Sequence, residues 1–315
     1  MTTQSRLVPL ALGGVAEHFN TPLRRAIARG VFARHGLAVS FLECPGGTGQ
    51  QLKQLRSGAI DACVALTEGL VTGLLVPPSS KGTTGYRLLG TLVQTPLNWM
   101  VATSASSTLT PEQVGDPSVP VRLAISRPFS GSHLIPLTHR GSSQNLTFVE
   151  RGDFAAMRAA VHSGDADGFL WDVSTTMPYV SGPTDEPSLR AAGTVVPAWP
   201  AFAVAVRDAV SPVAAAALAA GIADALREWR ALGADDRVAA VLELLPAYTP
   251  DGVAMWAAHT AYSDPDTQEG AVAWPTVSAR MVASVVRVLV DAGVLDRVPD
   301  LEVATVCDAA TRVVE

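Results

Sequence analysis

Several residue types that mark particular protein classes are scarce in this sequence. Its 315 residues include only three cysteines, Cys44, Cys63 and Cys307, and their spacing matches no metal-binding pattern. A disulfide framework is therefore not indicated, and no metal site is predicted. Lysine occurs only twice, the formal net charge is −6, and no run of basic residues is present. These properties argue against nucleic acid and anionic membranes as partners.

Long apolar segments are missing too. No stretch approaches the roughly 18 consecutive apolar residues that indicate a membrane-spanning helix. The opening residues, MTTQSRLVPLALGG, lack the charged and apolar regions of a secretion signal. We therefore expect a cytoplasmic protein that does not enter a membrane. The length is enough for about two domains at roughly 150 residues each, and 48% hydrophobic residues can supply their cores.

The stretch Leu37–Gly69 predicts a β-α-β unit. Leu37–Cys44 is an apolar run typical of a buried strand, and Asp61–Leu66 is a second one. Between them a glycine-rich turn opens a helix, where Thr48 is expected to form a capping box with Gln51. Because such a crossover joins parallel strands, the unit predicts a parallel sheet.

The same design occurs a second time. Residues 57–62 read SGAIDA and precede a strand and then Thr67-Glu68, while residues 163–168 read SGDADG and precede FLW and Asp172. Each copy predicts a helix, a Ser-Gly turn, an aspartate, a strand and an acid at the strand's carboxyl end. Ligands of open α/β sheets bind at that end. The repeat therefore favours two lobes facing a cleft over a coincidence between two ordinary β-α-β units.

We predict an α/β fold with two lobes and a helical C-terminal region. The first lobe comprises residues 1–96 and, after the chain returns, 197–315, and the second comprises 97–196. The Ala- and Leu-rich chain is expected to be helical from Ser211 onward, and Pro77–Gly85 is expected to be a surface loop.

Several sequence segments indicate a resemblance to a known family. They are ARGVFARHGLAVSFLE, GGTGQQLKQLRSGAIDACVALTEG, LAISRPFSGS and SGDADGFLWD. Through them, nearly the whole chain resembles the type II periplasmic-binding-protein superfamily, in particular its SsuA/THI5-like (NMT1-like) group. The phrases EHFNTPL, LTEG, QTPLNW, ISRPFSGS and FLWD are similar to a cytosolic fungal branch of that group, thought to derive from ancestral solute-binding proteins.

The resemblance implies two α/β lobes, a hinge of two crossing strands and a small ligand in the cleft. Known ligands of the group include sulfonates, nitrate and thiamin pyrimidine precursors. The chain departs from transporter-linked members because it shows no secretion signal. It also lacks the Cys-rich run and the cofactor-binding lysine signature of thiamin-pyrimidine synthases. The cysteine that desulfinases of this fold carry in the first-strand loop is absent from GGVAEHFNT.

The first-lobe candidates lie in three turns after predicted strands. They are Glu17, His18, Phe19, Asn20, Gly47, Thr48, Thr67 and Glu68. In the ligand-binding interpretation, His18 and Glu68 exchange hydrogen bonds or protons with the ligand, and the glycine-rich turn offers backbone N–H groups. In the alternative, Asn20 or Thr21 and Thr67 or Glu68 only cap helices, and His18 lies on the surface.

The second-lobe candidates form a possible anion site and an aromatic wall. The anion site comprises Ser126, Arg127, Ser130, Gly131 and Ser132, because serine hydroxyls, helix N–H groups and an arginine suit an anion. The alternative is an exposed arginine beside capping serines.

Aromatic residues near the crossover between lobes suit a flat ring beside an acid. The candidates are Gln94, Asn98, Trp99, Trp171, Asp172 and Trp199, the last on a strand expected over 198–206. Packing in the hinge or core is the alternative for each tryptophan. Trp229, Trp256 and Trp274, in the helical tail, are interpreted as structural.

The sequence thus predicts binding of a small polar or heterocyclic molecule, sulfonate-, carboxylate- or pyrimidine-like, in the cleft, with hinge closure. The alternative is a cytoplasmic biosynthetic enzyme, such as a lyase or a hydrolase-like enzyme, with His18, Glu68 and Asp172 as acid/base groups. No residue pair has a recognisable catalytic spacing, and a fold alone decides neither reading. A ligand-sensing regulator is a third class, although no DNA-binding segment is visible. No cofactor is predicted, and the oligomeric state stays open.

Overall fold

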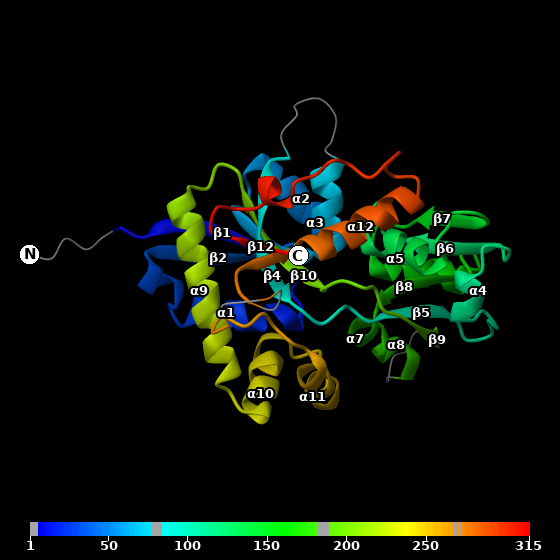
Figure 1. The fold of residues 1–315 in the computed structure, drawn as a ribbon. Coiled ribbons are helices and arrows are strands. Elements are labelled where there is room, and N and C mark those ends of the chain that lie inside the picture. Colours follow the sequence, from blue (N-terminus) through cyan, green and yellow to red (C-terminus); the bar gives the residue numbers. More distant parts are fainter. Residues whose placement is uncertain (1–5, 77–83, 182–188, 268–269, 271–272) are drawn as a thin grey trace, which may run out of the picture. The chain divides into compact units, whose positions relative to one another are not determined.

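The computed structural model divides the chain into two compact units (Figure 1). It describes residues 6–76, 84–181, 189–267, 270 and 273–315. Unit 1 comprises residues 1–95, 200–282 and 301–315, and unit 2 comprises residues 96–199 and 283–300. The loop predicted at Pro77–Gly85 lies almost entirely outside the described residues. Each unit contains one five-stranded sheet, which confirms the predicted two-lobe α/β fold.

The sheet of unit 1 combines three parallel strands with two antiparallel pairings. Its order is β2 (Leu37–Glu43), β1 (Val8–Gly14), β3 (Ala62–Leu66), β10 (Phe202–Arg207) and β4 (Tyr86–Val93). β1 pairs in parallel with β2 and β3, whereas β10 is antiparallel to both β3 and β4. The prediction of a parallel sheet therefore holds for β1, β2, β3 and β4 and fails at β10, which runs in the opposite direction.

The sheet of unit 2 has the same design. Its order is β7 (Leu146–Glu150), β6 (Val121–Ile125), β8 (Gly168–Asp172), β5 (Trp99–Ser104) and β9 (Leu189–Val195). β6 is parallel to β7 and β8, and β5 is antiparallel to β8 and β9. The antiparallel strand next to the parallel strands is β10 in unit 1 and β5 in unit 2. Each is the first strand that the chain forms after it crosses from the other unit.

The internal repeat has a structural cause in both units. Gly58 and Gly164 end their helices in the left-handed region, each with φ of 78°, a conformation that glycine adopts without strain. The aspartate three residues later then accepts a hydrogen bond from the backbone of the first parallel strand. Asp61 accepts from the Ala11 amide at 2.9 Å, and Asp167 accepts from the Arg122 amide at 2.7 Å. Each aspartate also pairs with an arginine, so the repeat fixes the start of β3 and of β8.

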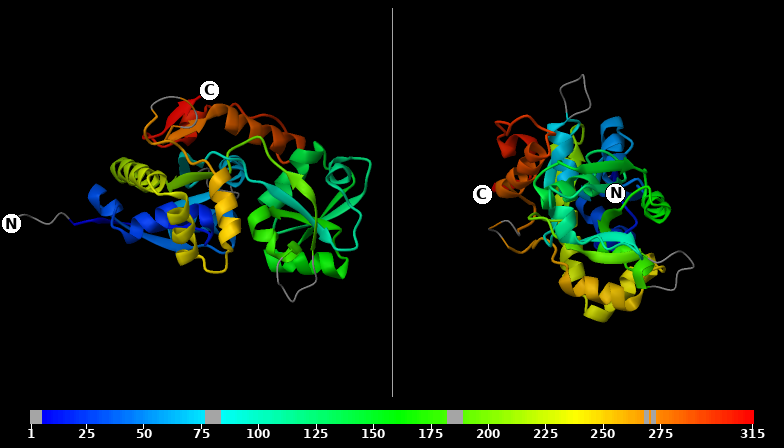
Figure 2. Two further views of the ribbon diagram at one scale, coloured as in Figure 1. Left: turned by 90° about the horizontal axis from the view of Figure 1, so that it is seen from below. Right: turned by 90° about the vertical axis from the view of Figure 1, so that its right-hand side faces the viewer.

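Helices of unit 1 pack on its sheet and on one another. They are α1 (Thr21–Ala28), α2 (Gly47–Ser57), α3 (Thr67–Leu75), α9 (Pro212–Arg230), α10 (Ala234–Leu244) and α11 (Pro250–His259), with short turns η1 (His18–Asn20) and η2 (Phe32–His35). Figures 1 and 2 show α10 and α11, in yellow and gold, lying side by side. Trp229, Val241, Leu245 and Val253 form the buried cluster between α9, α10 and α11.

Unit 2 has its own core. Met100, Met157 and Phe169 lie among its most buried side chains. Its helices are α4 (Pro111–Gly115), α5 (Gly131–Arg140), α6 (Phe154–Ser163), α7 (Val173–Thr176) and α8 (Pro178–Ser181). The remaining elements are β11 (Thr276–Ser278), α12 (Ala279–Asp291), η3 (Val303–Val306) and β12 (Arg312–Val314), and the division between the units falls within α12. None of the described helices is long and apolar enough to cross a membrane.

One predicted strand is wrong in its position. The strand expected over 198–206 starts only at Phe202, and a strand that was not predicted, β9, ends at Val195. Trp199 lies between the two strands. Pro197 and Pro200 flank it, and because proline has no backbone N–H to donate to a neighbouring strand, this segment cannot continue either strand.

Candidate functional site

In unit 1 the loop after β1 lies beside the end of β3. Phe19 stacks on Phe202 with ring centroids 3.6 Å apart and planes 16° from parallel. Phe202 in turn pairs with Leu66, the last residue of β3. Thr67 and Glu68 follow the strand directly, as predicted, and they form the first turn of α3. Two of the predicted turns are thereby brought to the same edge of the sheet.

Three oxygen atoms near this edge are buried without a hydrogen-bond partner among the described residues. They are Asn20 Oδ1, Thr21 Oγ1 and Thr67 Oγ1, and all three residues are fully buried. Asn20 uses only its amide nitrogen, which donates to the Val15 carbonyl at 2.9 Å. Neither Asn20 nor Thr67 makes a side-chain capping bond. The capping alternative therefore does not account for these polar groups, whose burial is costly unless something bonds to them.

Two acidic residues, Glu17 and Glu68, lie close in the sequence to these polar groups. Glu68 is 2% exposed and lies in the first turn of α3, where the helix dipole favours a negative charge. Its backbone carbonyl accepts a hydrogen bond from Thr72 Oγ1 at 2.6 Å. Glu17 is half-buried, and its carbonyl accepts from the Asn20 amide at 3.0 Å, which closes the loop.

The glycine-rich turn contributes differently from the prediction. Thr48 does not cap α2: its Oγ1 accepts a hydrogen bond from the Leu66 amide at 3.2 Å, and Gln51 donates to the Val64 carbonyl at 2.9 Å. The predicted capping box is thus wrong, because both side chains fasten α2 to β3 instead. Gly47, the first residue of α2, has φ of 62°. A Cβ on Gly69 would lie 2.5 Å from Thr48 Cγ2, so glycine is needed where α3 approaches α2.

His18 is enclosed by aromatic residues that the sequence did not assign to the site. Its ring lies 4.4 Å from that of Trp256 and 5.5 Å from that of Tyr248, measured between centroids. Its Nδ1 is 3.4 Å from the Tyr248 hydroxyl, and the Tyr262 hydroxyl donates to the Phe19 carbonyl at 3.0 Å. His18 is 4% exposed, which contradicts the surface alternative, and burial lowers its pKa to about 3.

In unit 2 three serines after β6 form one buried hydroxyl cluster. Ser132 Oγ lies 2.9 Å from Ser130 Oγ and 3.3 Å from Ser126 Oγ, and it accepts from the Ser126 amide at 3.0 Å. Ser130 precedes α5 but donates to the Arg127 carbonyl at 2.7 Å rather than capping the helix. Gly131 is the first residue of α5. Arg127 is half-buried, and its desolvation lowers the pKa of its guanidinium.

The predicted aromatic wall lies on the neighbouring strands β5 and β8. Trp99 pairs with Asp172 and Met100 with Trp171, and the two indole centroids are 6.5 Å apart. Trp99 is buried, and its Nε1 has no hydrogen-bond partner among the described residues. Asp172 caps α7 by accepting from the Thr175 amide at 3.0 Å. Asp172 is thus a helix cap, a role that the sequence did not predict for it, and it lies at the strand's carboxyl end as predicted.

Other candidates do not join these groups. Gln94 belongs to unit 1, where its amide nitrogen donates to Ser263 Oγ at 2.7 Å and its backbone N–H to the Ala261 carbonyl. Asn98 accepts from the Val173 amide through its carbonyl. Trp199 is 2% exposed and lies in the segment that returns from unit 2. In the part of the chain that the structure describes, no group of three His, Cys, Asp or Glu side chains could hold a metal ion.

Replacing Asp172 by Asn should change the pH dependence of stability. Burial raises the pKa of Asp172 to about 6, so its carboxyl group stabilises the fold fully below its unfolded pKa of 3.8 and loses that contribution as pH rises through about 6. The ionised form then costs about 3 kcal/mol. Asn also caps helices well, so D172N should keep the cap. The free energy of unfolding of D172N relative to the wild type should therefore rise by about 3 kcal/mol between pH 3 and pH 8. Chemical denaturation across this range measures the difference, and a constant difference would contradict the raised pKa.

Comparisons with known proteins identify the class of the fold. A conserved Candida albicans protein, which defines a family with the generic periplasmic binding protein fold, matches with a TM-score of 0.77 and 22% identity over 97% of this chain and 96% of that chain. The aliphatic sulphonate binding protein SsuA from Escherichia coli matches with a TM-score of 0.65 and 14% identity, over 96% and 93% of the two chains. SsuA from Xanthomonas axonopodis pv. citri, bound to MOPS, gives 0.66 and 16%, over 97% and 98%.

This chain therefore has the fold of the periplasmic binding proteins, as its resemblance to that superfamily predicted. No protein-family model and no curated protein matches the sequence.

Proposed function

We propose that this protein binds a small polar or heterocyclic molecule between its two units, which close on it. The carboxyl edge of the unit 1 sheet carries this proposal, because Asn20 Oδ1, Thr21 Oγ1 and Thr67 Oγ1 are buried there without partners among the described residues. A ligand that donates hydrogen bonds would satisfy them. The serine cluster and Arg127 of unit 2 would bind its anionic group, such as a sulfonate or carboxylate.

Two further observations support this class of ligand. The neutral His18, with Tyr248 and Trp256, supplies aromatic surface next to the polar groups of unit 1. Two of the structural relatives are sulfonate-binding proteins, one of them bound to MOPS, a molecule with both a sulfonate and a ring nitrogen.

The enzymatic alternative receives less support from the same groups. With a pKa of about 3, His18 is a poor proton acceptor near neutral pH. Asp172 already accepts hydrogen bonds as the cap of α7. Conversion of a bound ligand by the wild type, and its loss in Glu68→Gln, would establish the enzyme and overturn simple binding.

Thr67→Val tests the proposal at the oxygen that carries it. Valine has nearly the same shape but no hydroxyl, so the ligand-free protein should be as stable as the wild type or more stable, because a buried group without a partner is removed. Affinity for the ligand should fall about tenfold, the effect of one lost hydrogen bond of about 1.4 kcal/mol. Calorimetric titration and thermal unfolding measure the two effects.

Thr72→Val is the matched control on the same helix. Thr72 is also buried, but its hydroxyl already donates to the Glu68 carbonyl at 2.6 Å. Its replacement should leave the affinity unchanged. If Thr67→Val lowered stability and preserved affinity, Thr67 would serve the fold rather than a ligand.

A further inference from the structure

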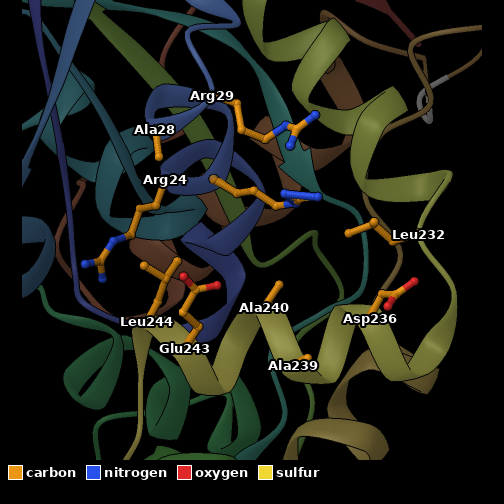
Figure 3. A pocket seen from close by; sticks show the side chains of 10 residues that line it. Arg24, Ala28, Arg29, Leu232, Asp236, Ala239, Ala240, Glu243 and Leu244 are labelled. Carbon is orange, nitrogen blue, oxygen red and sulfur yellow. The ribbon is translucent and has the colours of Figure 1, made fainter.

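A cavity of unit 1 lies between α1 and α10, and none of its lining residues is assigned to the proposed ligand site. Its volume is about 510 Å³, within the range of small-molecule sites. Figure 3 shows it between arginines of α1 and carboxylates of α10. The lining residues are Arg24, Arg25, Ala28 and Arg29 on one side and Leu232, Asp236, Ala239, Ala240, Glu243 and Leu244 on the other.

The sequence of the two helices explains why the cavity exists. Arg25, Ala28 and Arg29 share one face of α1 because they are three and four residues apart. On α10, residues 236, 239, 240, 243 and 244 also form a single face, again by three- and four-residue steps. Alanines occupy the middle of that face, so short side chains face the arginines where longer ones would fill the space. The charged groups are thereby kept apart across open space.

Charges in this cavity are incompletely paired. Arg24 pairs with Glu43 at 3.3 Å and Arg29 with Glu228 at 3.3 Å, both outside the cavity. Arg25 has no ion pair with any described residue, and its Nε is buried without a hydrogen-bond acceptor there. Across the cavity, Asp236 and Glu243 are exposed, and neither forms an ion pair with a described residue. One wall therefore offers a guanidinium, and the opposite wall offers two carboxylates.

We propose that this cavity binds a small zwitterion of the free amino acid class. Its carboxylate would accept hydrogen bonds from Arg25, which suits bidentate recognition of a planar anion, and its ammonium group would lie against Asp236 and Glu243. A molecule with both charges satisfies both walls, whereas a simple anion or a simple cation satisfies one.

Binding of amino acids with different charge separations tests the proposal. The probes are glycine, β-alanine, 4-aminobutyrate and 6-aminohexanoate, compared with butyrate and butylammonium, which carry one charge each. Isothermal titration and the NMR signal of the Arg25 side-chain Nε–H report binding. At least one amino acid should bind more than tenfold tighter than either singly charged compound and should shift the Arg25 signal.

Variants decide whether that binding uses the cavity. Arg25→Met, and the double change Asp236→Asn with Glu243→Gln, should each lower the affinity at least tenfold. Asp235→Asn, on the same helix but outside the cavity, should leave it unchanged. Ala28→Leu adds volume at an exposed position without changing a charge, so it should block binding even if Arg25→Met fails to fold.

Equal affinities for the amino acids and the singly charged compounds would overturn the proposal. So would binding that survives Ala28→Leu. Thr67→Val should not affect this binding, so the outcome is independent of the proposed function.

Discussion

The contribution of His18 to the free energy of unfolding should fall by about 1.4 kcal/mol for each pH unit below about pH 6. Burial lowers the pKa of His18 from 6.5 to about 3, so the unfolded chain binds a proton that the folded chain refuses. The contribution of neutral His18 is complete above pH 6.5 and is lost as the pH falls towards 3. Over that interval the total reaches about 5 kcal/mol.

His18→Leu isolates this effect, since Leu cannot be protonated. The free energy of unfolding of the wild type relative to the variant should therefore fall by about 1.4 kcal/mol per pH unit below about pH 6. Urea unfolding of both proteins at pH 7, 6, 5 and 4 measures this difference. Taking the difference between the two proteins also cancels the contribution of Asp172, whose raised pKa changes stability with pH in the opposite direction.

Tyr248→Phe separates burial from hydrogen bonding as the cause. It removes the hydroxyl that lies 3.4 Å from His18 Nδ1 but keeps the ring. Because burial is the cause of the lowered pKa, the steep pH dependence should persist in this variant. A difference between wild type and His18→Leu that stays constant with pH would show that the folded protein accepts the proton.

Asp308→Ala should destabilise unit 1 by about 3–5 kcal/mol. The carboxylate of Asp308 is 1% exposed and lies 2.6 Å from Arg87 Nε, whose side chain is 17% exposed. Arg87 also donates to the carbonyls of Arg207 and Val210, so it cannot turn towards water without breaking those bonds. Removing the acid leaves this largely buried cation with only Asp208, 3.9 Å away and 47% exposed, as a counter-ion, which is costly.

A surface ion pair provides the control for Asp308. Arg227 and Asp266 are 2.7 Å apart, but their side chains are 45% and 59% exposed. Asp266→Ala should cost less than about 1 kcal/mol because water screens the pair. The double variant Arg87→Met with Asp308→Leu should recover most of the lost stability, since well-packed apolar groups often replace a buried ion pair without loss. Equal effects of Asp308→Ala and Asp266→Ala in urea unfolding would contradict the buried pair.

Local sequence signals predicted much of the fold. The Ser-Gly turn and the following aspartate repeat because both units need the same left-handed glycine and the same bond from Asp61 or Asp167 to the adjacent strand. The prediction that each copy ends in an acid at the carboxyl end of its strand was less accurate. Asp172 corresponds to Leu66, which precedes α3, so Glu68 lies two residues beyond the equivalent position. Spacing alone could not show that helix α3 already begins at Thr67.

Side chains that reach across a unit could not be predicted in the same way. Thr48 had an apparent capping partner three residues away, but its hydroxyl bonds Leu66, which only the packing of α2 on β3 brings near. Trp256 was interpreted as structural because it lies in the helical tail. The contact between His18 and Trp256 depends on how α10 and α11 pack in unit 1. A sequence signal for it was that Tyr248, Trp256 and Tyr262 lie close together in the chain.

Native mass spectrometry of the purified protein, followed by denaturation and identification of any released molecule, tests small-molecule binding most directly. We predict a bound molecule at one per chain, polar or heterocyclic and carrying an anionic group, or, if the protein is isolated empty, stabilisation against heat by a sulfonate, pyrimidine or aromatic acid. Thr67→Val should weaken that binding and Thr72→Val should not. An empty protein that no such compound stabilises would contradict the proposed function.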